Sequence, residues 1–321
     1  MIFLLDKTER EKINKLIDTF KYNDEVANFL NNNIINEDLV VEAIDDYDIE
    51  ELDINEYQND NYYQNVKPKE IKVGNYQIKY EKYRPFQCFL YDDIEIDSED
   101  YYLVKNKIGY FKDEFKYLTI QKDSVIWMSV IPHEINTMKK CAKKLSKHVY
   151  VFGLGLAYFP YLIASKVDKI TIIEKDKNII DLFKNHIFPF FINKEKYEIV
   201  QEDAFTYLSK INKNDSIFID LWHNVNDGFM TYYLLNKKLK DYPNTIYWIN
   251  DSLLMAFRNI VVNLINEELN EEDIDYSKAN NEIDKITNNL HNLLKEKKIS
   301  SYLEIKKLLS NDSLKELMLK V

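Results

Sequence analysis

The chain has 321 residues, with 43 Lys and Arg against 54 Asp and Glu, so that its formal net charge is −11. Its 45% apolar content and its mere 5 Gly and 6 Pro exclude a disordered, fibrous or low-complexity protein. Cys88 and Cys141 form no C-x-x-C pair, which excludes a disulfide framework or a zinc ribbon and suits a reducing compartment. No signal-peptide pattern and no apolar run of 18 residues is present, so we expect a cytoplasmic protein without a membrane span.

The negative charge is concentrated near the N-terminus. Eleven acids and no Lys or Arg lie between Glu37 and Asp60, which leaves 43 acids against 43 bases in the rest of the chain. Apolar residues interleave with these acids, which predicts a packed helical segment with a solvated outer face. A docking surface for a basic partner or a role with the substrate are the alternatives. The acidity disfavours nucleic acid as a partner without excluding it, because the neutral remainder can still present a basic face.

The hydrophobic pattern divides the chain into four regions. Residues 1–66 read as an acidic helical N-terminal segment, and residues 67–130 hold short aromatic and β-branched runs that predict a small β-rich region. Residues 131–255 begin with a helix at Pro132 and then alternate strands with helices. Apolar strands are expected there at 148–152, 169–174, 197–201, 216–220 and 245–249. Residues 256–321 read as a helical extension. The predicted fold class is therefore α/β, a Rossmann-like, doubly wound and mostly parallel sheet.

Two of the five glycines, Gly153 and Gly155, lie where the first strand of this sheet turns into a helix. Such a turn needs a positive φ or a close approach of a ligand. Glu174 ends the next strand, 19 residues beyond Gly155, which is about the distance at which an acid reaches a ribose hydroxyl pair. These features predict a nucleoside site.

Acids also end the next two strands. Asp203 with Ala204 follows the third strand, where a carboxylate is placed to accept from an adenine amine, and Asp220 ends the fourth. The carboxyl ends of parallel strands meet at one edge, so these acids and Glu174 converge on the crevice where open α/β sheets bind ligands. Tyr158 stands where a dinucleotide fingerprint has its third glycine, so a nucleoside with an amino-acid tail fits better than NAD.

The sequence resembles a known family in four consecutive stretches. VYVFGLGLAYFPYL, ITIIEKD, EIVQEDAF and SIFIDLW are similar to the nucleoside-site motifs of class I S-adenosylmethionine (SAM)-dependent methyltransferases. From about Gly109 to residue 250 the chain looks closest to the spermidine-synthase-like branch, in which a segment like KYLTIQKDSVIWMSVIPHEI precedes the glycine motif. The resemblance implies an enzyme that binds SAM, or decarboxylated SAM and methylthioadenosine if it transfers an aminopropyl group.

The resemblance also implies roles for single residues. Gly153 and Gly155 would approach the methionine moiety, Glu174 the ribose, Asp203 with Ala204 the adenine, and Asp220 the methionine amino group or the acceptor. Leu221-Trp222-His223 departs from the short polar signature of aminopropyltransferases. We therefore expect a methyltransferase-like enzyme acting on an unidentified small-molecule or protein acceptor. The alternatives are an aminopropyltransferase and a non-catalytic interaction protein that retains the fold.

Other side chains are candidates for chemistry at the acceptor. Asp220 and His223 are the candidate catalytic residues, because a histidine side chain is suited to accept a proton as a general base; a structural histidine is the alternative. The candidate pocket residues are Trp127, Trp222, His133 and Glu134. Trp222 would shield a cation or pack in the core, and Glu134 also suits a helix N-terminus. No metal site is predicted, because no His/Cys/Asp cluster has ligand spacing. The possible protein partners are a second copy of the chain, or a partner that docks on residues 37–60 or on the helical tail.

Overall fold

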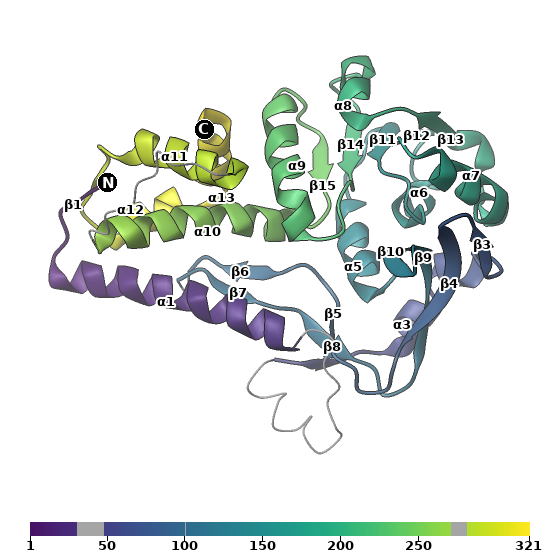
Figure 1. Cartoon of the computed structure of the whole chain (residues 1–321), viewed down its shortest axis with the longest axis horizontal. Coiled ribbons are helices and arrows are strands. Elements are labelled where there is room, and N and C mark those ends of the chain that lie inside the picture. Colours follow the sequence, from purple (N-terminus) through teal and green to yellow (C-terminus); the bar gives the residue numbers. More distant parts are fainter. Residues whose placement is uncertain (31–47, 100, 271–280) are drawn as a thin grey trace.

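A computed structural model of the chain describes residues 1–30, 48–99, 101–270 and 281–321 (Figure 1). Its central element is a five-stranded sheet, and all neighbouring strands are parallel in the order β13-β12-β11-β14-β15. The strands are β11 (His148–Phe152), β12 (Lys169–Glu174), β13 (Tyr197–Gln201), β14 (Ser216–Ile219) and β15 (Thr245–Tyr247). The apolar residues of β11, β12 and β14 are buried, as expected for parallel strands covered on both faces. The predicted α/β fold class is confirmed.

Helices connect these strands. They are α5 (Pro132–Cys141), which precedes β11, then α6 (Tyr158–Ile163), α7 (Lys177–His186), α8 (Ala204–Tyr207) and α9 (Val225–Lys238), with short 3₁₀ turns at Phe188–Phe190, Lys194–Lys196 and Leu208–Lys210. The chain leaves β11 toward β12 on one side and later returns to add β14 on the other. The point where the strand order reverses therefore lies between β11 and β14, which is where open α/β sheets bind ligands.

The apolar pattern after β14 predicts a helix from Phe229, whereas α9 begins four residues earlier, at Val225. Asn224 caps it with its side chain, and Asp227 at the third helical position completes a capping box. Such reciprocal bonds satisfy N–H groups that a helix start otherwise leaves unpaired. The early start shortens the loop after β14 and places Asp227 one turn beyond His223.

The β-rich region forms a separate antiparallel sheet of order β10-β9-β4-β3. Its strands are β3 (Ile71–Val73), β4 (Tyr76–Tyr83), β9 (Phe115–Lys122) and β10 (Val125–Ser129); β2 (Glu50–Glu51), β5 (Phe89–Leu90) and β8 (Ile108–Tyr110) form a smaller sheet, and β6 (Glu95–Asp97) pairs with β7 (Leu103–Lys105). The register of β10 shifts between Ile126 and Met128. β10 leads into α5 and carries Trp127 to the edge of the parallel sheet.

The acidic N-terminal stretch lies only partly within the described residues, since residues 37–47 fall outside them. Glu50 and Glu51 form a strand rather than the expected helix, because they pair with Gly109 and Tyr110 of β8. The short helices α3 (Ile54–Gln58) and α4 (Asn61–Asn65) follow, capped by the side chains of Asp53 and Asp60.

Asp60 has a second structural role. Its carboxylate forms an ion pair with Lys139 at 2.8 Å and accepts a hydrogen bond from the Tyr158 hydroxyl at 3.0 Å. The neighbouring Tyr62 donates from its hydroxyl to the Leu156 carbonyl at 2.7 Å. This part of the N-terminal segment therefore ties α4 to the turn that carries Gly155.

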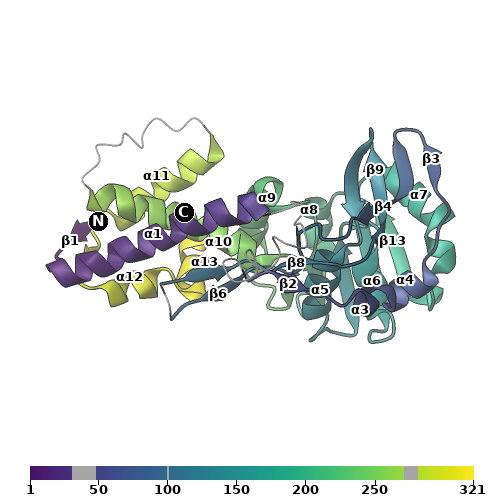
Figure 2. The ribbon, with the colours of Figure 1, turned by 90° about the horizontal axis from the view of Figure 1, so that it is seen from below.

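The two ends of the chain form one helical body. Figures 1 and 2 show α1 (Lys7–Leu30) lying beside the C-terminal helices α10 (Asn250–Leu269), α11 (Glu282–Leu294), α12 (Tyr302–Leu308) and α13 (Asn311–Lys320). β1 (Ile2–Phe3) pairs in parallel with β16 (Lys298–Ile299), and the Met1 amine contacts Glu268 at 2.8 Å. Within the described ranges, no helix combines the length and hydropathy needed to cross a bilayer.

Candidate active site

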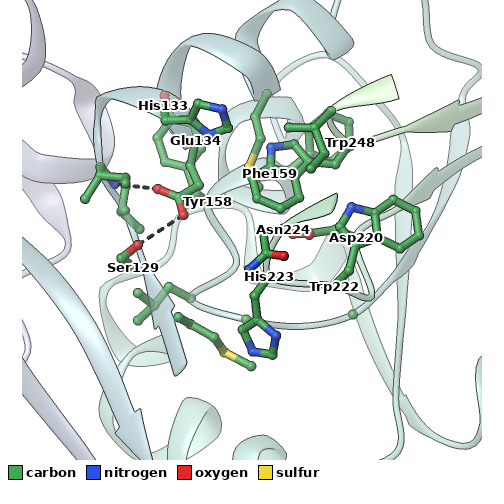
Figure 3. A pocket seen from close by; sticks show the side chains of 18 of the residues that line it. Ser129, His133, Glu134, Tyr158, Phe159, Asp220, Trp222, His223, Asn224 and Trp248 are labelled. Atoms are coloured by element: carbon green, nitrogen blue, oxygen red, sulfur yellow. Dashed lines mark hydrogen bonds between the residues drawn. The ribbon is translucent and has the colours of Figure 1, made fainter. Parts of the chain in front are cut away.

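A cavity of about 430 Å³ lies at the carboxyl edge of the parallel sheet, at the reversal between β11 and β14 (Figure 3). Its walls come from the glycine turn, β10, the start of α5 and the loop after β14. The cavity brings together eight of the predicted residues: Gly153, Gly155, Trp127, Trp222, His133, Glu134, Asp220 and His223. The structure thus gathers side chains from segments that lie about 90 residues apart in the sequence.

All three tryptophans of the chain line this cavity: Trp127, Trp222 and Trp248. Trp248 follows β15 and is a residue that the sequence analysis did not select. The available signal was that each tryptophan lies within, or just after, a strand that ends at this edge. Among the described residues that line the cavity, none is Lys or Arg. The lining therefore combines aromatic faces with acids, and the lysine beside it, Lys122, has its Nζ 4.7 Å from the centroid of the Trp127 ring.

The two glycines of the turn are required for different reasons. Gly153 has φ +94°, and a Cβ atom there would lie 2.0 Å from the Asp220 carbonyl oxygen. Gly155 has φ +53°, but the nearest atom to its Cβ position, the Met128 sulfur, is 3.8 Å away. Gly153 thus admits the backbone of the adjoining strand, whereas Gly155 supplies only a positive φ.

Glu174, Asp203 and Ala204 do not line this cavity. The half-buried Glu174 carboxylate lies behind the glycine turn, where it accepts from the N–H of Leu154 at 3.2 Å and of Asp176 at 2.8 Å. Asp203 is exposed, and its Oδ1 caps α8 by accepting from the N–H of Phe205 at 2.9 Å. These residues share the carboxyl edge with the cavity, on the side of β12 and β13.

Asp220 is the acid most directly presented to the cavity. Its side chain is half-buried and forms no hydrogen bond or ion pair within the described part of the chain, while its backbone N–H donates to the Phe152 carbonyl at 2.9 Å. Burial raises the pKa of Asp220 to about 7. A carboxyl group without a partner among the described residues, titrating near neutral pH, is suited to bind a cation or to take up a proton.

Glu134 faces Asp220 from the opposite wall (Figure 3). It accepts from the Ser129 hydroxyl at 3.0 Å and from the Ile131 N–H at 2.8 Å, and the second bond caps the start of α5. Burial raises the pKa of Glu134 to about 8, although these hydrogen bonds oppose the shift and the nearby Asp220 adds to it. Glu134 is therefore largely protonated at pH 7. As the pH rises, Asp220 loses its proton before Glu134 does.

This titration predicts a pH-dependent effect of Glu134→Gln. The folded protein holds the Glu134 proton up to about pH 8, whereas the unfolded chain releases it near pH 4.3. Stability therefore falls as pH rises between these values. Glutamine does not titrate, and its Oε1 can accept from the Ile131 N–H while its Nε2 donates to the Ser129 hydroxyl. We expect the variant to gain about 2–4 kcal/mol relative to wild type between pH 5 and pH 9, measured by urea unfolding.

Glu134→Ala is the control for the cap. It loses the capping bonds at every pH, which costs about 1 kcal/mol. If the free energies of unfolding of wild type and Glu134→Gln change in parallel between pH 5 and pH 9, then Glu134 is ionised in the folded protein throughout and the argument fails.

The two histidines of the cavity differ. Burial lowers the pKa of His133 to about 4, so its ring is neutral and packs edge-on against Trp248 with centroids 5.8 Å apart. The exposed His223 ring contacts Trp127 at 4.3 Å between centroids, and its Nδ1 lies 2.6 Å from Oδ2 of Asp227.

Asp227 was not selected from the sequence. It holds His223 in place by accepting also from the backbone N–H of His223, at 3.1 Å, and of Asn224, at 2.9 Å. Burial opposes this, yet these hydrogen bonds leave the pKa of Asp227 below its usual value. The signal in the sequence was the i, i+4 spacing of His223 and Asp227 across a helix start. In the described ranges, no three His, Cys, Asp or Glu side chains are placed to hold a metal ion.

Part of the chain is similar to a known protein family. Residues 129–238 match the Spermine/spermidine synthase domain, a region that includes the glycine turn, Glu134, Asp220 and Trp222. A search of curated proteins gave no significant match. Among solved structures, the spermidine synthase of Thermotoga maritima matches with 14% identity and a TM-score of 0.33, covering 46% of this chain and 60% of that one. About a third of the chain is thus similar to the Spermine/spermidine synthase domain.

Proposed function

We propose that the chain is an aminopropyltransferase-like enzyme that uses decarboxylated SAM and a small amine acceptor. The observation that carries this proposal is the cavity lining: two carboxyl groups, three tryptophans and, among the described residues, no Lys or Arg. Carboxylates and aromatic faces stabilise a cation, whereas the carboxylate of SAM would meet no cationic side chain here. The match of residues 129–238 also supports aminopropyl transfer over the methyl transfer that the motifs alone favoured.

The nucleoside would lie across the glycine turn. Glu174, held by the N–H groups of Leu154 and Asp176, is the candidate ribose acid, and Asp203 with Ala204 the candidate adenine contact. The cationic tail would then extend past Gly155 into the cavity, toward Asp220. This assignment fits a ligand whose tail carries an amine and no carboxylate.

Different residues of the cavity have different roles in the proposed reaction. When bound, decarboxylated SAM supplies a carbon next to a sulfonium, at which a C–N bond forms while the C–S bond breaks and its electron pair stays on sulfur. Asp220 binds the acceptor ammonium and takes the proton that the attacking nitrogen loses. His223, oriented by Asp227, passes that proton to solvent. Trp127 and Trp222 exclude water and shield the positive charge.

Calorimetry with two pairs of nucleosides tests this function. We expect decarboxylated SAM to bind at least about 10-fold more tightly than SAM, and methylthioadenosine more tightly than S-adenosylhomocysteine, because each favoured ligand lacks the carboxylate. Glu174→Ala is the control, since it should weaken all four ligands alike. Equal or tighter binding of SAM would favour methyl transfer, and a folded sample that binds none of them would favour a non-catalytic role.

A further inference from the structure

The wall of the cavity that carries Asp220 also carries an unsatisfied hydrogen-bond donor. Trp222 is 5% exposed, and its indole Nε1–H has no hydrogen-bond partner within the described residues. A buried donor without an acceptor is destabilising, and such groups are rare in native proteins. A ligand atom or a water that accepts from this N–H would remove that cost.

A glycine in the neighbouring helix makes room for the Trp222 ring. Gly228 lies in the first turn of α9, and a Cβ atom there would come within 2.6 Å of Cγ of Trp222. Glycine inside a helix is destabilising relative to alanine. Glycine at this position lets the indole lie against the helix, so the N–H is held in one orientation.

Asp220 and Trp222 are separated by one residue and line the same side of the cavity (Figure 3). They are not hydrogen-bonded to each other, since the indole N–H of Trp222 has no partner in the described part of the chain. The pair thus places one acceptor and one buried donor at this wall of the cavity. A simple alkyl diammonium ion offers only donors, so it would match Asp220 and leave Trp222 unpaired.

We propose that the acceptor substrate is an amine that also carries an uncharged oxygen acceptor, as in an amino alcohol or an amino amide, with its ammonium on Asp220 and its oxygen on Nε1 of Trp222. The oxygen is uncharged because Glu134 and Asp220 face the same space and the described lining has no Lys or Arg. This inference rests on the proposed function, since the amine is the group that would be alkylated.

The test compares three probes of similar length: 4-aminobutan-1-ol, 1,4-diaminobutane and 4-aminobutanoate. Their affinities are measured by calorimetry on the full chain saturated with methylthioadenosine, or on the free chain if that nucleoside does not bind. We expect the amino alcohol to bind about 10-fold more tightly than the diamine, and the amino acid to bind weakest. Trp222→Phe should abolish the preference for the alcohol over the diamine. A ratio of two affinities on one variant does not depend on its stability.

Trp248→Phe is the matched control. The Nε1–H of Trp248 already donates to the Thr137 hydroxyl at 2.8 Å, so its removal should leave the ratio unchanged. If the diamine binds as well as the alcohol, or if Trp222→Phe keeps the ratio, the inference is wrong and Trp222 is satisfied by water. Failure of decarboxylated SAM to bind, with the alcohol preference intact and dependent on Trp222, would overturn the proposed reaction but leave this binding pair standing.

Discussion

Asp220→Asn is expected to lower turnover with decarboxylated SAM and an amine by about 10²–10³-fold, while making the folded protein more stable at high pH. In the proposed reaction, turnover falls because the variant loses the acid that would hold the ammonium and accept its proton. Stability rises because the pKa of Asp220, raised by burial to about 7, makes ionisation of this side chain unfavourable in the folded state. In the unfolded chain the Asp220 side chain ionises near pH 3.9, so the stability of the wild-type protein declines between about pH 4 and pH 7.

The measurements are steady-state rates together with urea unfolding at pH 4 and pH 9. Relative to wild type, Asp220→Asn should gain about 2–4 kcal/mol across that interval. Asp241→Asn is the control, because Asp241 forms only an exposed ion pair with Lys213 at 3.8 Å and should change neither quantity. Undiminished turnover would remove Asp220 from the chemistry, and a gain that does not depend on pH would contradict its raised pKa.

Gly153→Ala is expected to destabilise the protein by about 3–5 kcal/mol and to abolish nucleoside binding. The added methyl group would lie 2.0 Å from the Asp220 carbonyl oxygen at a residue with φ +94°, so β11 and β14 must separate at the point where the nucleoside is proposed to bind. Thermal or urea unfolding gives the loss of stability, and calorimetry with methylthioadenosine gives the loss of binding.

Alanine substitutions at two other glycines are the controls that distinguish steric overlap from backbone strain. Gly74 has φ +62° with no atom within 4 Å of its Cβ position, and Gly155 has φ +53° with its nearest contact at 3.8 Å. Alanine at either position introduces strain alone, which costs about 1–2 kcal/mol. Equal losses of stability for Gly153→Ala and Gly74→Ala would show that the contact with Asp220 relaxes without cost.

The strands of the parallel sheet were predictable to within two residues. The expected ranges 148–152, 169–174 and 197–201 coincide with β11, β12 and β13, and the remaining two strands end slightly earlier than expected. Strands buried on both faces are continuous apolar runs, which contrast with the amphipathic helices between them. The pairing of Glu50 and Glu51 with β8 was missed, because an edge strand formed by two acids has no apolar pattern of its own.

The cavity could be predicted only where strand ends determine it. Gly153, Asp220 and Trp222 follow β11 and β14, so their proximity follows from the order of the strands. Trp248 follows β15, yet a tryptophan after an apolar strand is also an ordinary core residue. Asp227 depends on where α9 begins, and the boundary of a helix is set by its capping hydrogen bonds rather than by its apolar period.

Local residue patterns were sufficient to predict the fold class, the place of the glycine turn and the acids at the ends of neighbouring strands. Which acids share a cavity depends on tertiary contacts and became visible in the structure: Glu134 and Asp220 line it, whereas Glu174 and Asp203 accept hydrogen bonds from backbone N–H groups outside it. The structure also shows that Trp222 holds a donor with no partner within the described residues and that the first and last helices form one body. Burial and hydrogen-bond partners come from contacts between distant segments, which no local pattern records.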